Sequence, residues 1–291
     1  MQIVSAKPMD YKPVSGHRTG DITFKRLVQG APGAIDNFEL SLVRNAGSYY
    51  TPRHRHNFDQ VRMVLAGEFG YAGRKTMPVG SIGYFPEGTY YGPQNVESCI
   101  TLTLQCGAPS GDGFLSYDQL HNGHIELSQL GRFEQGVFYR NPDSNRRPGV
   151  KRNQDGYEAI WEHVMGRKLR YPKARYTEPV IMLPEAYDWR PTETPGIANK
   201  LLGVFVNNTR IELLRLDAGA AHRLSAERAI HLLFALKGAG SCNGESWGPE
   251  TAIKVERDEQ ARLVASESAE VLLIAMAELA PSKARELPKV A

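Results

Sequence analysis

The sequence predicts an all-β chain of short strands that fold into sandwiches or barrels. Three observations favour this class. Apolar and polar residues alternate in both halves of the chain, and a period of two is typical of half-buried strands. The pair Asn243-Gly244 is a strong hairpin signal. The 28 glycines and 18 prolines among 291 residues favour many tight turns between short elements.

The strands of the first half are predicted from this alternation. The pattern is clearest where Phe38, Leu40 and Leu42 share one face, and another strand ends at the turn residue Gly67. We expect strands over residues 37–43, 61–65, 81–85 and 98–104.

The second half repeats this style. We expect strands over residues 201–206, 211–216, 229–236, 261–265 and 271–277. Short strands at regular spacing in each half indicate two barrels or sandwiches.

The middle of the chain is rich in loop signals such as Asn141-Pro142. One short helix is expected there, capped by Asp155 and stopped by Gly166, with Tyr157, Ile160, Trp161 and Val164 on one face. The predicted organisation is a first barrel with an N-terminal extension over residues 1–106, a connector over 107–195, and a second barrel over 196–291.

Composition excludes several classes of function. The formal net charge of +3 gives no strong basic field for nucleic acid, and the longest apolar stretch, residues 271–277, is too short to span a bilayer. No apolar signal core follows Met1, and Cys99, Cys106 and Cys242 form no metal-binding pair and no even disulfide set. We therefore expect a cytoplasmic protein without nucleic-acid or membrane partners.

Two histidines and an amide form the candidate site. On a strand, His54, His56 and Gln60 point to one face, so two imidazoles and an amide converge on one side of a sheet. Such a group is a plausible metal corner on a rigid scaffold. Glycines and a proline shape a turn further on that can bring Tyr91 beside the histidines.

These residues resemble the two sequence motifs of the cupin superfamily. In the first motif His54, His56 and Gly67 fit, Gly47 lies one residue further out than the pattern asks, and Gln60 takes the place of the glutamate. The second motif is matched by Gly80, Pro86, Gly88 and Asn95, with Tyr91 in the place of the histidine. The resemblance implies a small jelly-roll barrel with any metal in its interior.

The second half resembles a degenerate copy of this barrel. Gly238 ends a strand as Gly67 does, but Ser225 and Glu227 fall where the two histidines would be. The resemblance covers about residues 35–106 and 200–278 and implies a two-barrel cupin, called a bicupin, with its site in the first barrel.

The resemblance implies one divalent or ferric transition-metal ion, with iron preferred and manganese, nickel, copper or zinc as alternatives. His54, His56, Gln60 and Tyr91 are the expected ligands. Replacing glutamate by Gln60 removes a negative charge beside the cation, and Tyr91 restores it only as phenolate. Alternatively, Tyr91 is an acid or base near the substrate, or part of the barrel wall. No organic cofactor is expected.

Arg62 shares the strand face of Gln60. A guanidinium inside a small barrel is costly without an anionic partner. That partner is a substrate carboxylate or phosphate, or an acid of the barrel itself. Alternatively, Arg62 lies at the open rim of the barrel.

These residues together predict a metal-dependent bicupin enzyme, dioxygenase-like, that acts on a small carboxylated molecule, with isomerase or lyase chemistry as further options. Tyr91 and Arg62 are the expected catalytic residues. The alternative is a metal-free cupin that binds a small ligand without catalysis. The family resemblance further implies a homodimer, since cupin barrels often pair through exposed strand edges.

Overall fold

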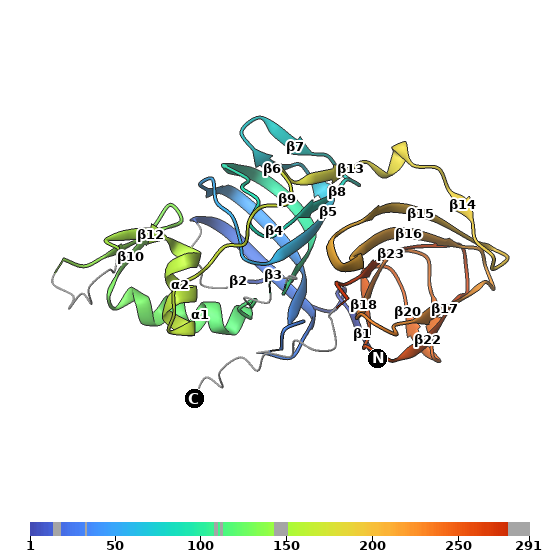
Figure 1. The fold of residues 1–291 in the computed structure, drawn as a ribbon. Helices are drawn as coiled ribbons and strands as arrows, with labels where there is room; N and C mark the ends of the chain where they lie inside the picture. Colours follow the sequence, from blue (N-terminus) through green and yellow to red (C-terminus); the bar gives the residue numbers. More distant parts are fainter. Residues whose placement is uncertain (14–18, 33, 108–109, 111–112, 143–150, 279–291) are drawn as a thin grey trace. The chain divides into compact units, whose positions relative to one another are not determined.

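The chain was analysed as a computed structural model that describes residues 1–13, 19–32, 34–107, 110, 113–142 and 151–278. The described residues divide into two compact units. The N-terminal unit comprises residues 11–181, and the C-terminal unit comprises residues 1–10 and 182–278 (Figure 1). None of the described helices is long and apolar enough to cross a membrane.

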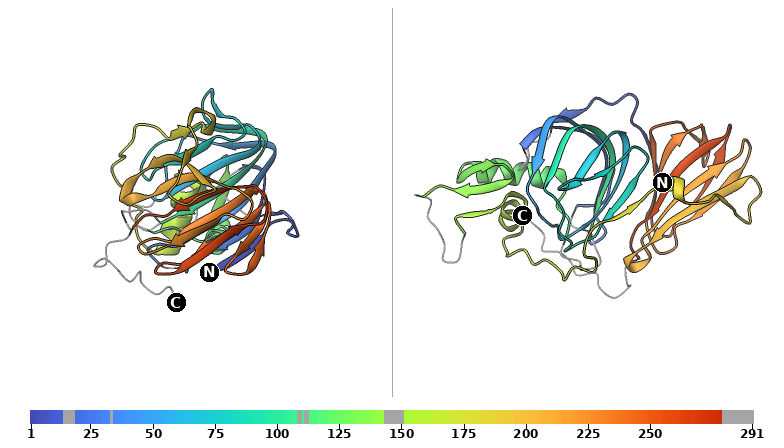
Figure 2. Two further views of the ribbon diagram at one scale, coloured as in Figure 1. Left: turned by 90° about the vertical axis from the view of Figure 1, so that its right-hand side faces the viewer. Right: turned by 90° about the horizontal axis from the view of Figure 1, so that it is seen from above.

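The N-terminal unit is built on a seven-stranded sheet of order β13-β8-β5-β9-β4-β3-β2. Its strands curve into a barrel, which is seen from above in Figure 2. The strands are β2 (Lys12–Pro13), β3 (Thr19–Gln29), β4 (Phe38–Thr51), β5 (Asp59–Gly67), β8 (Ile82–Phe85), β9 (Gln94–Cys106) and β13 (Val180–Met182). The hairpin β6 (Phe69–Ala72) and β7 (Lys75–Met77) completes the barrel, and Phe69, Met77 and Phe85 pack in its core.

A small helical layer belongs to the same unit. It contains α1 (Tyr117–Ser128), α2 (Gly156–Met165) and a three-stranded sheet of β10 (Gly131–Glu134), β11 (Val137–Arg140) and β12 (Asn153–Asp155). A second core, with the fully buried Trp161 at its centre, joins the two helices to Phe58 of the barrel. The predicted connector is thus partly a cap on the first barrel.

Helix α2 has the predicted caps. The Asp155 carboxylate accepts a hydrogen bond from the Glu158 N–H at 3.1 Å, and Gly166 ends the helix in the left-handed region at φ 64°. Helix α1, which the sequence analysis does not predict, begins with a capping box between Ser116 and Gln119.

The C-terminal unit is a jelly roll of two sheets. The larger has the order β1-β21-β18-β23-β16-β15-β14 and the smaller the order β17-β22-β19-β20. The larger sheet contains β1 (Gln2–Ser5), β14 (Arg190–Pro191), β15 (Ile197–Val204), β16 (Arg210–Leu216), β18 (His231–Lys237), β21 (Thr251–Val255) and β23 (Ala269–Ala275). The smaller contains β17 (Ala221–Ser225), β19 (Gly240–Cys242), β20 (Glu245–Trp247) and β22 (Gln260–Ala265). An apolar core that includes Leu233, Trp247 and Leu273 separates them.

The predicted fold class is confirmed. Each half is a jelly roll, and Asn243-Gly244 joins β19 to β20 with both residues at positive φ, as a type I′ turn requires. The units differ from the three predicted segments, because β1 pairs with β21 and so belongs to the C-terminal unit. Residues 279–291 of the predicted second barrel lie outside the described residues.

Candidate functional site

His54 and Tyr91 face each other across an isolated antiparallel β-bridge. The backbone N–H of each residue donates to the carbonyl of the other, at 2.9 and 3.0 Å. Directly opposed residues of such a pair project their side chains to the same face, and the two ring centres are 4.4 Å apart. The Nδ1 of His54 lies 2.7 Å from the Pro52 carbonyl, so Nδ1 carries a proton and donates to this oxygen.

Three polar atoms from three residues meet beside this bridge. The Gln60 Nε2 donates to His56 Nδ1 at 2.6 Å and to the Tyr91 hydroxyl at 3.1 Å. The Tyr91 hydroxyl is 3.0 Å from His56 Nδ1. The structure therefore brings His54, His56, Gln60 and Tyr91 into one buried cluster.

Arg62 fixes the orientation of the Gln60 amide. Its Nε and Nη2 donate to Gln60 Oε1 at 3.0 and 2.8 Å. Because a guanidinium only donates, the amide oxygen must face Arg62 and the NH2 group must face His56 and Tyr91. Gln60 thus presents donor hydrogens, not an oxygen, to the histidine side of the cluster.

Arg62 itself is buried, with 9% of its surface exposed. Its guanidinium carbon lies 4.8 Å from the centre of the Phe69 ring and 5.8 Å from that of Phe85. Within the described residues it forms no ion pair, whereas Glu39, another buried charge of this barrel, is paired with Arg26 at 2.9 Å. A buried cation without a carboxylate partner suits an anionic ligand.

A cavity of about 110 Å³ opens beside these residues. His54, His56, Arg62 and Tyr91 lie in its wall together with polar side chains of β4 and β9, namely Asn45, Gln94, Thr103 and Gln105. The helical layer contributes Tyr117 and Tyr157 to the same wall. The Tyr157 hydroxyl donates to Asn57 Oδ1 at 3.0 Å, which ties helix α2 to the loop that carries the histidines.

The backbone of the histidine segment differs from the predicted strand. Strand β5 begins at Asp59, so Gln60 and Arg62 share its inner face, but His54 and His56 lie in the loop before it. That loop is held by the bridge to Tyr91 and by the Gly88 N–H, which donates to the His56 carbonyl at 2.8 Å. Pairing with residues 88–91 keeps both imidazoles beside the strand.

The sequence analysis does not identify the polar wall contributed by β9. Thr101, Thr103 and Gln105 alternate with Leu102 and Leu104, so one face of the strand is polar over residues 101–105. The same alternation occurs on β5, where Gln60 and Arg62 alternate with apolar residues. Polar residues at every second position of an otherwise apolar strand are the signal that finds this wall.

The neighbouring acid Asp59 points to the opposite side of β5. Its carboxylate accepts from the Tyr84 hydroxyl and the Glu87 N–H, each at 2.8 Å. Burial raises the pKa of Asp59 to about 6. Asp59 therefore supplies no carboxylate to the cavity.

The donor set fits a transition metal in part. The Tyr91 hydroxyl lies 3.0 Å from His56 Nδ1, so an imidazole and a phenol lie side by side, although Nδ1 already accepts a hydrogen bond from Gln60 Nε2. Imidazole and phenol are donors that such ions accept. Gln60 does not fit, because Arg62 holds its oxygen. Across the described residues, no three His, Cys, Asp or Glu side chains meet as a metal site.

The second half offers no comparable group within its described residues. Glu227 and His231 lie at another cavity, described below. The three cysteines are buried and unpaired with one another.

Comparison with solved structures identifies the fold. The chain superposes on a proposed dioxygenase from Nostoc punctiforme with a TM-score of 0.59 at 13% identity, covering 96% of this chain and 83% of that one. It superposes on oxalate decarboxylase of Bacillus subtilis, described with Mn(II) centres, with a TM-score of 0.52 at 11% identity, covering 96% and 78%. For a single-residue variant of salicylate 1,2-dioxygenase from Pseudoaminobacter salicylatoxidans the TM-score is 0.51 at 17% identity, covering 84% and 72%.

No sequence-family description and no curated protein matches the chain. The structural likeness confirms the cupin resemblance at the level of the fold: this is a two-barrel cupin fold.

Proposed function

We propose that the N-terminal barrel is the site of a cupin enzyme that acts on a small carboxylated molecule. The observation that carries this proposal is the buried guanidinium of Arg62, without an ion pair among the described residues, at the wall of a cavity that also exposes two imidazoles and a phenol. A carboxylate would receive charge-assisted hydrogen bonds from Arg62 in a desolvated setting. The aromatic wall formed by Tyr117 and Tyr157 would cover its apolar part.

The proposal includes one transition-metal ion, with iron preferred. His54 and His56 would hold it, and Gln60 and Tyr91 would border it. A bound ion of this kind supplies Lewis acidity and, for iron, access to dioxygen. The likeness to proteins named as dioxygenases and as a manganese-containing decarboxylase supports oxidation or carbon–carbon cleavage as the reaction class.

The residues of the chain have separate roles in this scheme. Arg62 orients the substrate carboxylate, and the Tyr91 hydroxyl, in contact with His56 Nδ1, exchanges a proton with the substrate. The contact between Tyr157 and Asn57 keeps the helical layer over the cavity and so limits the entry of water.

Metal analysis of the purified, untagged chain tests the metal. We expect near-stoichiometric metal in the wild type and background metal in a His54→Ala/His56→Ala variant. The matched control is His121→Ala/His163→Ala, which removes two imidazoles of helices α1 and α2 and should retain the metal. Background metal in the wild type after reconstitution with Fe(II), Mn(II) and Zn(II) would exclude the metal-dependent enzyme.

Calorimetric titration with oxalate and with salicylate tests whether Arg62 binds a carboxylate. Arg62→Met removes the charge at similar volume, and we expect it to weaken binding at least about tenfold, the effect of losing a charged hydrogen bond. Arg44→Met, on an exposed position of β4, is the control and should bind as the wild type does. Equal affinity of Arg62→Met and the wild type for these anions would show that Arg62 does not bind the carboxylate.

A second candidate function is binding of a small anion without metal or catalysis. The orientation of Gln60 favours it, because an NH2 group faces the histidines and a fixed positive charge lies behind the amide. The two experiments separate the candidates: anion binding that depends on Arg62, with no retained metal, supports the binding protein.

A further inference from the structure

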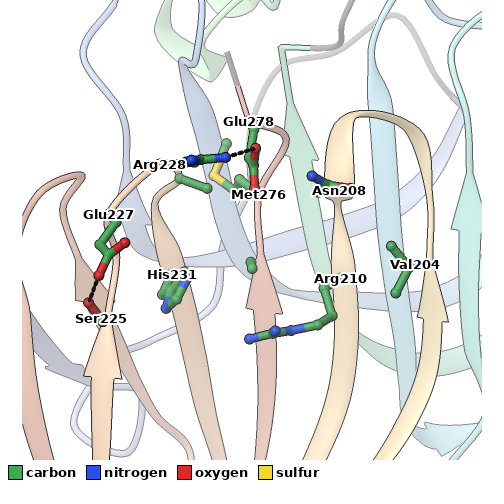
Figure 3. Close-up of a pocket in the computed structure, with 11 residues that line it drawn as sticks. Val204, Asn208, Arg210, Ser225, Glu227, Arg228, His231, Met276 and Glu278 are labelled. Carbon is green, nitrogen blue, oxygen red and sulfur yellow. Dashed lines mark hydrogen bonds and ion pairs between the residues drawn. The ribbon is translucent and has the colours of Figure 1, made fainter. Parts of the chain in front are cut away.

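A larger cavity lies in the C-terminal barrel, in a part of the chain to which nothing above gives a role. Its volume is about 470 Å³, within the range of small-molecule sites. Arg210, His231 and Ala275 lie in its wall, and Asn208, Arg228 and Glu278 also line it (Figure 3).

The sheet register explains why these side chains meet. Ala275 of β23 is paired with Arg210 of β16 on one side and with His231 of β18 on the other. Paired residues project to the same face. The core residues Leu233 of β18 and Leu273 of β23 lie on this face, two positions from His231 and Ala275. Arg210 extends toward His231 (Figure 3). The strand between them carries the small side chain of Ala275 at this level, and Ala275 also lines the cavity.

The acidic groups near this cavity already have partners. Glu278 lies 3.8 Å from Arg228, and Glu227 accepts a hydrogen bond from the Ser225 hydroxyl at 3.1 Å. Glu212, buried on β16, accepts from Asn199 at 3.0 Å and lies 3.2 Å from Arg210 Nε.

The wall of the cavity, in contrast, holds two nitrogen atoms that lack a well-formed hydrogen bond. His231 Nδ1 is buried and has no hydrogen-bond partner among the described residues, and Arg210 Nε lacks a well-formed hydrogen bond despite its approach to Glu212. Burial lowers the pKa of His231 to about 4, and the charges of Arg210 and His222 contribute to this shift. The imidazole is therefore neutral.

We propose that the C-terminal barrel holds a second binding site, in which Arg210 and His231 Nδ1 take the carboxylate of a small organic acid. Arg210 of β16 and His231 of β18 lie on the two strands that flank β23, and each would take one oxygen of a planar carboxylate. Since Glu212 already offsets part of the charge of Arg210, Arg210 and His231 suit a single carboxylate group, which carries one negative charge, rather than a phosphate group, which carries up to two. This site is independent of the proposed function of the N-terminal barrel.

Succinate serves as the probe, and the His231 side chain as the reporter. The full-length chain carrying Arg62→Met, labelled with ¹⁵N-histidine, is titrated by NMR at pH 7, and the His231 signal is assigned with His231→Gln. The Arg62→Met background removes the anion site proposed for the first barrel. We expect a saturable shift of the His231 signal.

Three variants in this background make the test specific. Arg210→Gln should weaken succinate binding at least about tenfold. Ala275→Leu keeps every charge but fills the space between Arg210 and His231, and it should weaken binding to a similar extent. Arg223→Gln, at an exposed position of β17, is the control and should bind as its parent does.

Two outcomes would overturn the inference. One is the lack of a saturable shift of His231 at any succinate concentration, and the other is unchanged affinity in both Arg210→Gln and Ala275→Leu. Phosphate that binds as tightly as succinate would overturn the carboxylate assignment. None of these results bears on the anion site proposed for the first barrel. That site is tested separately, by comparing Arg62→Met with the wild type.

Discussion

At the scale of single residues, Gln60 determines which charges the first barrel can hold. Its amide joins Arg62 on one side to His56 and Tyr91 on the other. The sequence alone could place Gln60 and Arg62 on one strand face, because they are two positions apart. It could not show that Arg62 holds the amide oxygen, since that depends on the rotamers of both side chains.

We predict that Gln60→Glu weakens the binding of anions and strengthens the binding of divalent metal ions. The new carboxylate would pair with Arg62 and place a negative charge beside His56. Oxalate affinity, measured by calorimetry, should fall about tenfold or more because the guanidinium is neutralised, while retention of divalent metal should rise. Unchanged oxalate affinity would contradict the role assigned to Arg62.

Glu87 makes stability depend on pH. It is buried just after β8 and accepts hydrogen bonds from the Ser110 backbone and hydroxyl. Burial raises its pKa to about 7, and the charge of Asp59 adds to the shift. A carboxyl group with a raised pKa in the folded state stabilises the fold below its unfolded pKa, and this stability is lost as the pH rises through about 7.

We therefore predict that the substitution Glu87→Gln stabilises the folded protein more at pH 8 than at pH 5. Its free energy of unfolding relative to wild type should rise by about 1–2 kcal/mol between these values, allowing for solvent screening. Urea denaturation of both proteins at both pH values measures the change. A difference that is the same at pH 5 and pH 8 would show that Glu87 does not titrate with folding.

At the scale of elements, the sequence indicates strands more readily than helices. Alternation locates β4, β5, β9 and the main strands of the second half, because each has one buried face. Helix α1 escapes prediction since few of its residues are buried, and Tyr117, Gly123 and Leu127 do not form an evident apolar stripe. The histidines are expected on a strand, but only pairing with distant Tyr91 determines the course of their loop.

Helix α2 supplies a test of the link between the helical layer and the cavity. Asp155→Ala removes the N-cap and should lower the free energy of unfolding by about 1 kcal/mol. Asp155→Asn retains the cap and is the matched control. Because α2 carries Tyr157, oxalate affinity should also fall in Asp155→Ala, as measured by calorimetry alongside thermal unfolding. Normal affinity in a destabilised variant would show that the layer does not support the site.

At the scale of the whole molecule, the chain passes from one unit to the other and back. Residues 1–10 belong to the C-terminal unit, residues 11–181 form the N-terminal unit, and residues 182–278 complete the C-terminal unit. Two barrels could be predicted because each half has its own alternation. The placement of β1 could not, since four residues of an added edge strand carry no signal for their partner.

We predict that deletion of residues 1–10 destabilises the C-terminal unit selectively. Strand β1 covers the edge of β21, with Ile3 opposite Ile253 and Val4 opposite Ala252. Hydrogen exchange should show faster exchange in β21 and β18, while β5 and β9 keep their protection. Equal loss of protection in both units would contradict this division.

The position of β1 has a consequence for biosynthesis. The ribosome makes residues 2–5 before it has made the edge they join, about 250 residues later. At typical translation speeds this interval lasts roughly 10–50 s, during which the first barrel has time to fold. Residues 2–5 must therefore stay unpaired while the first barrel folds, and they join the sheet of the C-terminal unit only after β21 has been made.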